Sequence, residues 1–141
     1  MSSADHHDIV ETMSFFDSWE DRYRYMIDLG KEIPFLAEHL KTEDKIVPGC
    51  QSQVWIIHKI VDNKIEFQVD SDALIVKGLL AIVMAAYNHK TTDEILSFDI
   101  EDYFKKLDLV KHLSPTRGNG LKAMVEKIRL IAASARPTTT D

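Results

Sequence analysis

The sequence has 141 residues, 45% hydrophobic and 28% charged, which is typical of a globular chain large enough for one domain with its own core. Its 23 acidic residues outnumber its 17 basic ones, and the net charge of −6 disfavours binding to nucleic acid phosphates. The single cysteine excludes an internal disulfide, a dithiol redox pair and a metal site built from cysteines alone. We expect one domain over residues 1–141, with no bound metal.

The N-terminal stretch MSSADHHDIV lacks the basic and apolar segments of a secretory signal. The longest apolar stretch, Gly78 to Tyr87, is far shorter than the roughly 20 residues that span a bilayer. We therefore expect a cytoplasmic protein without membrane contact. The polar ends, about residues 1–9 and 136–141, are expected to be disordered tails.

The first predicted helix starts after Ser18, a good N-cap, and ends near Gly30, with apolar residues at helical spacing between them. A short turn from Pro34 to Leu40 follows, in which Pro34 suits the first position of a helix. The charged residues 41–45 are predicted to be a linker.

A β-hairpin is predicted next. Residues 53–61, QVWIIHKIV, are rich in β-branched and aromatic side chains, and residues 62–64, DNK, separate them from a second run, residues 64–69. In that second run Ile65, Phe67 and Val69 alternate with polar residues, so one face is expected to be buried and the other to be wet.

A buried helix is predicted from Ala73 to Tyr87, with Ser71 or Asp72 as its cap, because the segment is apolar on nearly every side. Gly78 lies inside it and favours close packing against the sheet. Asn88 should end this helix.

Three further helices follow in the pattern. Thr91 and Glu94 form a capping box, residues 100–107 have helical spacing, and Ser114 with Pro115 begins a long apolar-striped helix. Helices, then a hairpin, then helices predict an α+β fold, with a small antiparallel sheet of the hairpin and room for a third strand, packed by helices mainly on one face.

Cys50 lies in the stretch VPGCQSQVWI, where Pro48 fixes its own φ angle and Gly49 is free to adopt a positive one. A thiol here would project from a bend. The alternative is that Cys50 is a small apolar residue tucked under the sheet, and the two interpretations are about evenly balanced.

No base or metal site accompanies this thiol in the sequence. His58, the nearest histidine, lies far along the predicted strand, and the six histidines lack zinc-ligand spacing. The helix start at Ser114 to Gly120 offers free N–H groups and the charge of Arg117, which could steady a sulfur anion. Alternatively, the glycines there permit close packing and Arg117 pairs with a surface acid.

Three segments resemble the SufE family of sulfur-acceptor proteins, including its close relative CsdE, over about residues 15–133. These segments are VPGCQSQVWI (47–56), DSDALIVKGLLA (70–81) and LSPTRGNGLKAMVEKI (113–128). The resemblance implies a fold like SufE and the IscU-type scaffolds. It also implies that Cys50 accepts sulfur from the persulfide of a SufS-type cysteine desulfurase, stimulates that enzyme, and passes the sulfur to a SufB-containing scaffold for iron–sulfur cluster assembly.

The resemblance further implies that pyridoxal phosphate belongs to the desulfurase and that this chain carries no cofactor. It assigns Arg117 to support of the cysteine loop or to docking, and Gly49 and Gln51 to shaping that loop. We expect a monomer or weak homodimer that acts as a sulfur-transfer partner and not as a stand-alone enzyme.

Other functions remain open from the sequence. A CsdE-like acceptor would serve a CsdA-type desulfurase, and the shared motifs do not separate the two. A self-sufficient cysteine enzyme would turn over a small substrate alone, although no base is evident. An interaction module would activate the desulfurase without carrying sulfur, and replacement of Cys50 would then have no effect.

Overall fold

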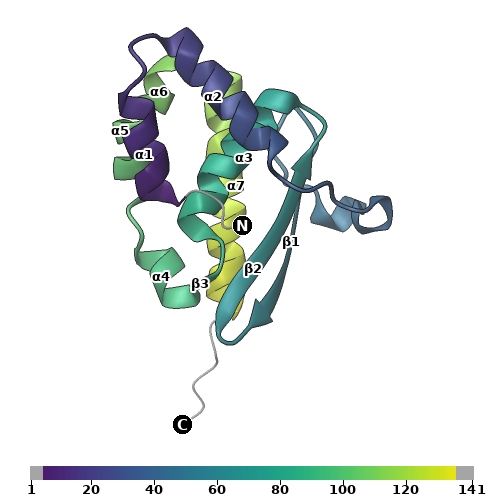
Figure 1. The fold of residues 1–141 in the computed structure, drawn as a ribbon. Coiled ribbons are helices and arrows are strands. Elements are labelled where there is room, and N and C mark those ends of the chain that lie inside the picture. Colours follow the sequence, from purple (N-terminus) through teal and green to yellow (C-terminus); the bar gives the residue numbers. More distant parts are fainter. Residues whose placement is uncertain (1–4, 136–141) are drawn as a thin grey trace.

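A computed structural model describes residues 5–135, within which seven α-helices and a three-stranded antiparallel sheet form an α+β fold, as predicted. Figure 1 shows the sheet on the right of the helices, with the long helices α3 and α7 beside the hairpin. The helices are α1 (His6–Ser14), α2 (Trp19–Lys31), α3 (Leu74–Tyr87), α4 (Thr92–Ser97), α5 (Ile100–Lys106), α6 (Leu109–His112) and α7 (Pro115–Ala135).

The hairpin prediction is confirmed. β1 (Val54–Val61) pairs antiparallel with β2 (Lys64–Ser71), and the turn residues Asp62 and Asn63 have left-handed φ angles of 52° and 68°. Such a two-residue turn matches the twist of the paired strands. A third strand, β3 (Lys90–Thr91), pairs only with the start of β2.

One face of the hairpin is buried, as the alternation predicts. Ile65, Phe67 and Val69 are at most 5% exposed and pack with the helical core. The opposite face is partly covered at one end by the segment after α2, which contains two short 3₁₀ helices, Glu38–Leu40 and Glu43–Lys45. This covered end of the sheet is also where the cysteine loop begins.

Gly78 allows close packing, but the expectation that it faces the sheet is wrong. It contacts α2, because a Cβ added at Gly78 would lie 2.4 Å from the carbonyl oxygen of Met26. Reciprocally, a Cβ on Gly30 would lie 2.6 Å from the backbone nitrogen of Gly78. The two glycines therefore let α2 and α3 meet backbone to backbone. The hydrophobic pattern of α3 does not indicate whether Gly78 faces the sheet or another helix.

The N-terminal tail is shorter than expected. The prediction of disorder up to residue 9 is wrong for residues 6–9, which form the start of α1, and Asp5 and Asp8 make a reciprocal capping box there. Ile9 is 1% exposed, so burial of the apolar face adds to the capping energy. The predicted tails at residues 1–4 and 136–141 lie outside the described residues.

The other helix starts and ends follow the sequence closely. Ser18, the Thr91–Glu94 capping box and Ser114 act as predicted, and α3 ends before Asn88. Two expectations were wrong. Pro34 lies in a non-helical segment, and α3 has no side-chain cap, because the Asp72 carboxylate instead accepts the N–H of Gln53.

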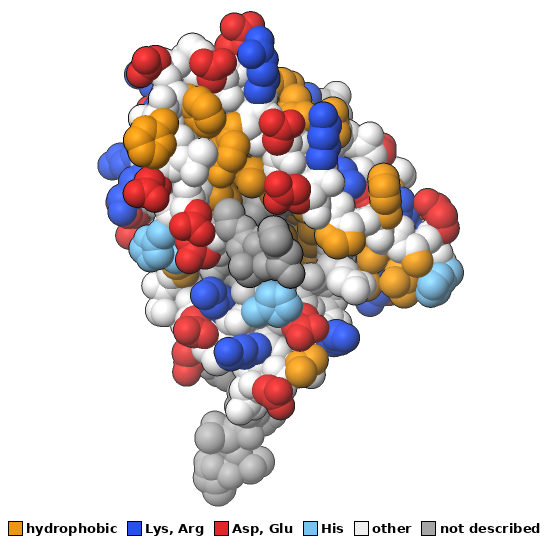
Figure 2. Space-filling model, in the orientation of Figure 1, with side chains coloured by type: hydrophobic (Ala, Val, Ile, Leu, Met, Phe, Trp, Pro, Cys, Tyr) orange, Lys and Arg blue, Asp and Glu red, His pale blue; other side chains and the backbone are white. Residues whose placement is uncertain are grey.

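Surface charges of both signs are interspersed on the face shown in Figure 2. Among residues 5–135, no helix has the combined length and apolar character needed to cross a bilayer.

Candidate functional site

The cysteine loop, defined as residues 48–52, enters from a short strand-like pairing. The N–H of Val47 donates to the carbonyl of Val54 over 2.8 Å, and Ile46 forms an isolated bridge with Trp55. Val47 and Val54 are at most 1% exposed, so this end of the loop is fixed in the core.

The loop's outgoing end is held by Gln53. Its N–H donates to Asp72 Oδ1 over 3.1 Å, and its carbonyl accepts from Ser71 Oγ at 2.8 Å and from the Asp72 N–H at 3.3 Å. Three hydrogen bonds therefore tie this end of the loop to the connection between β2 and α3. The sequence predicts only a capping role for Ser71 and Asp72, because their contact with Gln53 depends on the hairpin register.

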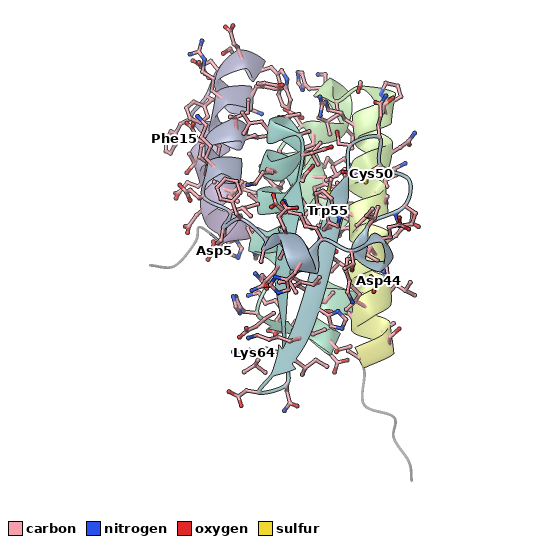
Figure 3. All side chains as sticks on the ribbon, turned by 90° about the vertical axis from the view of Figure 1, so that its right-hand side faces the viewer. Asp5, Phe15, Asp44, Cys50, Trp55 and Lys64 are labelled. Carbon is pink, nitrogen blue, oxygen red and sulfur yellow. The ribbon has the colours of Figure 1, made fainter. Side chains whose placement is uncertain are left out.

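The tip carries Cys50 against the N-terminal half of α7, where Figure 3 shows it beside β1 and Trp55. The side chain is half-buried and packs against the core, and its Sγ donates to the carbonyl oxygen of Gly120 over 3.6 Å. Within residues 5–135, this is the only hydrogen bond between the cysteine loop and another part of the fold. The thiol is neither fully projecting nor fully buried, so the structure lies between the two interpretations of the sequence.

Burial raises the pKa of the Cys50 thiol. The neutral thiol also suits its partner, since a carbonyl oxygen accepts a hydrogen bond from S–H but repels a thiolate. The described conformation therefore holds the sulfur in its less reactive form.

Gly49 adopts the positive φ angle that the sequence allows. Its φ angle is +91°, which L side chains rarely adopt, and a Cβ placed there would come 3.4 Å from the Cβ of Ala123 on α7. Pro48, Gly49 and Gln51 are exposed. One side of the loop tip is thus exposed to solvent, and the other side contacts α7.

The start of α7 is less open to an anion than its sequence suggests. Ser114 accepts the N–H of Arg117 on its Oγ at 3.3 Å and the N–H of Gly118 on its carbonyl at 2.8 Å. The side chain of Arg117 is half-exposed, and within the described residues it makes no ion pair. The alternative in which Arg117 pairs with a surface acid is therefore not what the described residues adopt.

A buried carboxylate secures the strands below the loop. Asp70 is 2% exposed, and it accepts the N–H groups of Leu36 at 3.1 Å and Ser71 at 2.8 Å. Lys41 and Lys77 each place Nζ 3.4 Å from one of its oxygens. Burial alone would raise the pKa of Asp70, but these hydrogen bonds and the two lysines lower it below its usual value.

The two lysines also face aromatic rings. Lys41 lies 5.1 Å from the ring centre of Trp55, the strand partner of Asp70, and Lys77 lies 4.5 Å from that of Phe35. The cluster therefore fixes the segment after α2 to the strand that leads out of the cysteine loop. The sequence gives no signal for this cluster, since its members come from four separate segments: the segment after α2, β1, β2 and α3.

His58 and the cysteine lie in different settings. His58 is exposed in the middle of β1, with its ring centre 6.5 Å from that of Phe67. Partial burial of the ring, followed by the charges of Lys45 and Lys127, lowers its pKa. Among the described residues, no group of three histidine, cysteine or carboxylate side chains is placed to hold a metal ion.

Comparison with known proteins matches this chain to one family. The family model described as "SufE: Fe-S metabolism associated domain" matches residues 7–132. An uncharacterized SufE-like protein of Rhizobium etli is 47% identical over 133 residues, covering 92% of this chain and 88% of that protein. Another from Rhizobium meliloti is 42% identical over 141 residues, covering 97% of this chain and 99% of its own length.

A solved structure has the same fold. The solution structure of a hypothetical protein from Thermus thermophilus superposes with a TM-score of 0.76 and covers 96% of this chain and 98% of its own, at 15% sequence identity. That likeness supports the α+β architecture. The family match over most of the chain and the two relatives together establish that this protein belongs to the SufE family, whose domain is associated with Fe–S metabolism.

Proposed function

We propose that this protein is a sulfur acceptor and carrier in iron–sulfur cluster assembly. Cys50 takes the terminal sulfur from the persulfide of a SufS-type cysteine desulfurase, stimulates that enzyme by clearing its product, and passes the sulfur to a SufB-containing scaffold. The pyridoxal phosphate that releases sulfur from cysteine belongs to the desulfurase. The exchange takes place in the cytoplasm, where thiols stay reduced.

One observation carries this proposal. The cysteine loop is fixed at both ends but contacts the rest of the fold at its tip mainly through one thiol hydrogen bond and partial burial against α7. A thiol contact of this kind is weak, so the tip can leave α7 while its ends stay in place. A sheltered thiol is protected from oxidation between transfers, and an extended tip reaches into a partner's active site.

The transfer itself needs one thiolate and no external oxidant. The Cys50 thiolate attacks the outer sulfur of the partner persulfide, the S–S bond of that persulfide breaks, and the partner cysteine leaves as a thiolate. Cys50 then carries the outer sulfur as its own persulfide. Because no second cysteine is present to attack this persulfide, the sulfur stays on the chain until the next acceptor thiol takes it.

Departure from α7 also changes the acidity of the thiol. Burial is what raises the pKa of Cys50, so leaving the contact with α7 returns the thiol toward its ordinary acidity and increases the fraction of reactive thiolate. The loop movement thus couples docking to activation. The free protein keeps the sulfur less reactive.

Intact-mass spectrometry tests the proposal directly. The protein is incubated briefly with a SufS-type desulfurase, pyridoxal phosphate and cysteine, beside a Cys50→Ser control. We expect the mass of one sulfur atom to be added to the wild-type chain only, and to be removed by a reductant. No addition with an active SufS-type enzyme would contradict the SufS assignment, and addition with a CsdA-type enzyme instead would identify the CsdE-like alternative.

The rate of the desulfurase separates carrying sulfur from mere activation. Cys50→Ser should abolish stimulation measured as sulfide release with a thiol reductant. If the Cys50→Ser protein still accelerated the enzyme, the protein would act as an interaction module and the carrier role would be wrong.

Arg117 is proposed to support the cysteine loop or docking. Arg117→Ala is compared with wild type for desulfurase affinity and for sulfur uptake in the saturated complex. Weaker binding with unchanged uptake would assign Arg117 to docking, and unchanged binding with slower uptake would assign it to the loop. No change in either would remove Arg117 from the site.

A further inference from the structure

The outer edge of β2 is only half covered. The sheet order is β1-β2-β3, and β3 contributes two residues, opposite Lys64 and Ile65. Farther along β2, the side chain of Asn88 takes the place of a strand, since its Oδ1 accepts the Phe67 N–H at 2.7 Å and its Nδ2 donates to the Phe67 carbonyl at 3.3 Å. Beyond Phe67, no further strand residue pairs with this edge within residues 5–135.

The direction of the backbone groups follows from this pattern. The His89 N–H donates to the Ile65 carbonyl, and Asn88 pairs with both backbone groups of Phe67, so these two β2 residues point away from β1. In an antiparallel pair such residues alternate along the strand. The N–H and carbonyl of Val69 therefore point to the same open edge.

Val69 is buried without partners for these groups. The residue is 5% exposed, and no hydrogen bond from the rest of the described chain reaches its outward N–H or carbonyl. Because Val69 also lines an open groove, solvent or a partner can reach these two groups. An unpaired strand edge is the standard template for an added strand.

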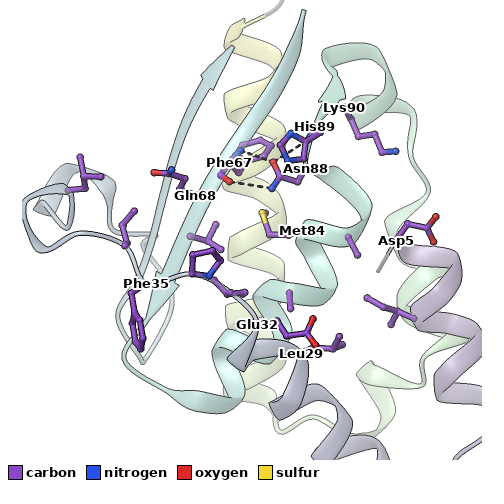
Figure 4. Close-up of a pocket in the computed structure, with 18 of the residues that line it drawn as sticks. Asp5, Leu29, Glu32, Phe35, Phe67, Gln68, Met84, Asn88, His89 and Lys90 are labelled. Atoms are coloured by element: carbon purple, nitrogen blue, oxygen red, sulfur yellow. Dashed lines mark hydrogen bonds between the residues drawn. The ribbon is translucent and has the colours of Figure 1, made fainter. Parts of the chain in front are cut away.

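A groove adjoins this edge. Figure 4 shows it between β2 and the ends of α1 and α2, with Met84 of α3 at its floor, and its volume is about 760 Å³. Apolar side chains dominate its floor and walls, including Leu29, Ile33, Ala81 and Met84. The space beside Val69 is thus large enough for side chains as well as backbone.

The groove also has a defined charge pattern. Asp5 and Glu32 line the helical side opposite β2, but the Asp5 carboxylate caps α1 and points away from the groove. His89 and the cationic Lys90 line the end at β3. His89 lies 3.8 Å from Glu66, which offsets its charge when it is protonated. A basic side chain that projects across the groove from β2 would meet the Glu32 carboxylate, at the end away from Lys90.

We infer that this groove binds an extended, mainly apolar peptide segment of a partner protein that carries a basic side chain and adds to the free edge of β2 at Val69. Backbone pairing supplies the hydrogen bonds, the apolar floor takes alternate side chains, and Glu32 takes the basic one. A small apolar molecule would fill the floor but leave the donor and acceptor of Val69 unpaired. The site lies on a different surface element from the cysteine loop, so it does not depend on the proposed sulfur transfer.

Hydrogen exchange of the free protein tests whether the backbone N–H of Val69 is unpaired. The amides of Gln68 and Asp70 point toward β1 and lie in the β1–β2 ladder, which should protect them from exchange. They therefore serve as internal controls on either side of Val69. We expect the Val69 amide to exchange much faster than both. Equal protection at Val69 would mean that the edge is already paired, and the inference would be wrong.

Binding is tested with a short acetylated and amidated peptide in which valine alternates with lysine. Saturating peptide should slow exchange of the Val69 amide at least about tenfold and shift the NMR signals of Phe67, Val69 and Met84. The same peptide with N-methylated valines loses the backbone donors and should not bind. Equal binding by both peptides would contradict strand addition.

A filled groove gives a second check. Ala81→Trp should abolish peptide binding, while Leu130→Trp, at an exposed position on α7, should leave it unchanged. If Ala81→Trp fails to fold, Glu32→Lys should weaken binding severalfold by reversing a groove charge. Binding only after deletion of residues 1–4 would show that this chain's own terminus competes for the groove, and would contradict an open site for a partner.

Discussion

Two pairs of glycines in this protein differ in how tightly the chain packs around them. At Gly30 and Gly78, an added Cβ would lie 2.6 Å or less from backbone atoms of the facing helix, so α2 and α3 are locked together. At Gly49 and Gly120, an added Cβ would meet its nearest neighbours at 3.4 and 3.7 Å, which is ordinary contact. The same residue type gives a rigid scaffold at one place and a loosely seated cysteine loop at the other.

This difference suits a relay of sulfur. A scaffold that shifted would misplace the ends of the loop, whereas a tip packed as tightly as the α2–α3 contact could not leave α7. The helices and the strands that hold the loop make the tight contacts, whereas the described part of the chain gives the tip one weak hydrogen bond. Local stability of this kind varies widely within one domain.

The largest effect on the free energy of unfolding is expected at the α2–α3 contact of Gly30 and Gly78. Gly78→Ala should reduce the free energy of unfolding by about 3 kcal/mol, because its Cβ would overlap the Met26 carbonyl. Gly118→Ala is the matched control on α7, because an added Cβ there would have no neighbour within 4 Å among residues 5–135 outside its own helix backbone. It should stabilise the protein by about 0.5–1 kcal/mol. Chemical denaturation measures both, and an equal effect of the two changes would contradict the comparison.

Asp70 should show the next largest effect, because it secures the strand beneath the cysteine loop. Asp70→Asn leaves Lys41 and Lys77 without their buried partner and should cost about 3 kcal/mol. Asp102→Asn removes an exposed pair with Lys106 and should cost less than about 1 kcal/mol. A small loss of unfolding free energy in Asp70→Asn would show that the Asp70 cluster adds little to the stability of the fold.

The contribution of Asp70 should also depend on pH. Its pKa is lowered in the folded protein, so the stabilisation is complete above the ordinary carboxyl pKa of about 4 and is lost as the pH falls through the folded value. Denaturation at several acidic pH values should show a smaller loss of stability in Asp70→Asn than in wild type. A parallel pH dependence of the two proteins would contradict this.

Gly49 should show a smaller effect on stability and a larger one on reactivity. Its φ of +91° disfavours any side chain, so Gly49→Ala should cost about 1–2 kcal/mol and shift the tip away from α7. Alkylation of Cys50 by iodoacetamide should then be faster. Gly120→Ala makes only ordinary contact with Sγ and should not accelerate it, and equal rates in both variants would argue against the seating of the tip by Gly49.

The smallest expected effect is on the thiol's titration. Because burial raises the pKa of Cys50, its thiolate fraction at neutral pH is below that of a free cysteine, and its alkylation rate should rise at higher pH than in a cysteine peptide. The unfolded protein should return to the peptide's profile. A folded profile at or below the peptide's would mean that the tip spends most of its time away from α7.

Much of this molecule follows from short stretches of sequence. The alternation in β2, the Asp62–Asn63 turn, the caps at Ser18, Thr91 and Ser114, and the positive φ of Gly49 depend on residues next to one another, so local sterics and hydrogen bonding determine them. The chemistry available to the loop also follows from the sequence, since it supplies a single thiol.

Only the tertiary structure decided how that thiol is held. Cys50 meets Gly120, 70 residues away, and Gly78 meets Met26 of another helix. Asp70 gathers partners from the segment after α2 and from α3. The open edge at Val69 likewise exists because β3 stops after two residues. Such contacts depend on where separate elements pack against one another, and hydrophobic periodicity specifies which face is buried but not which neighbour buries it.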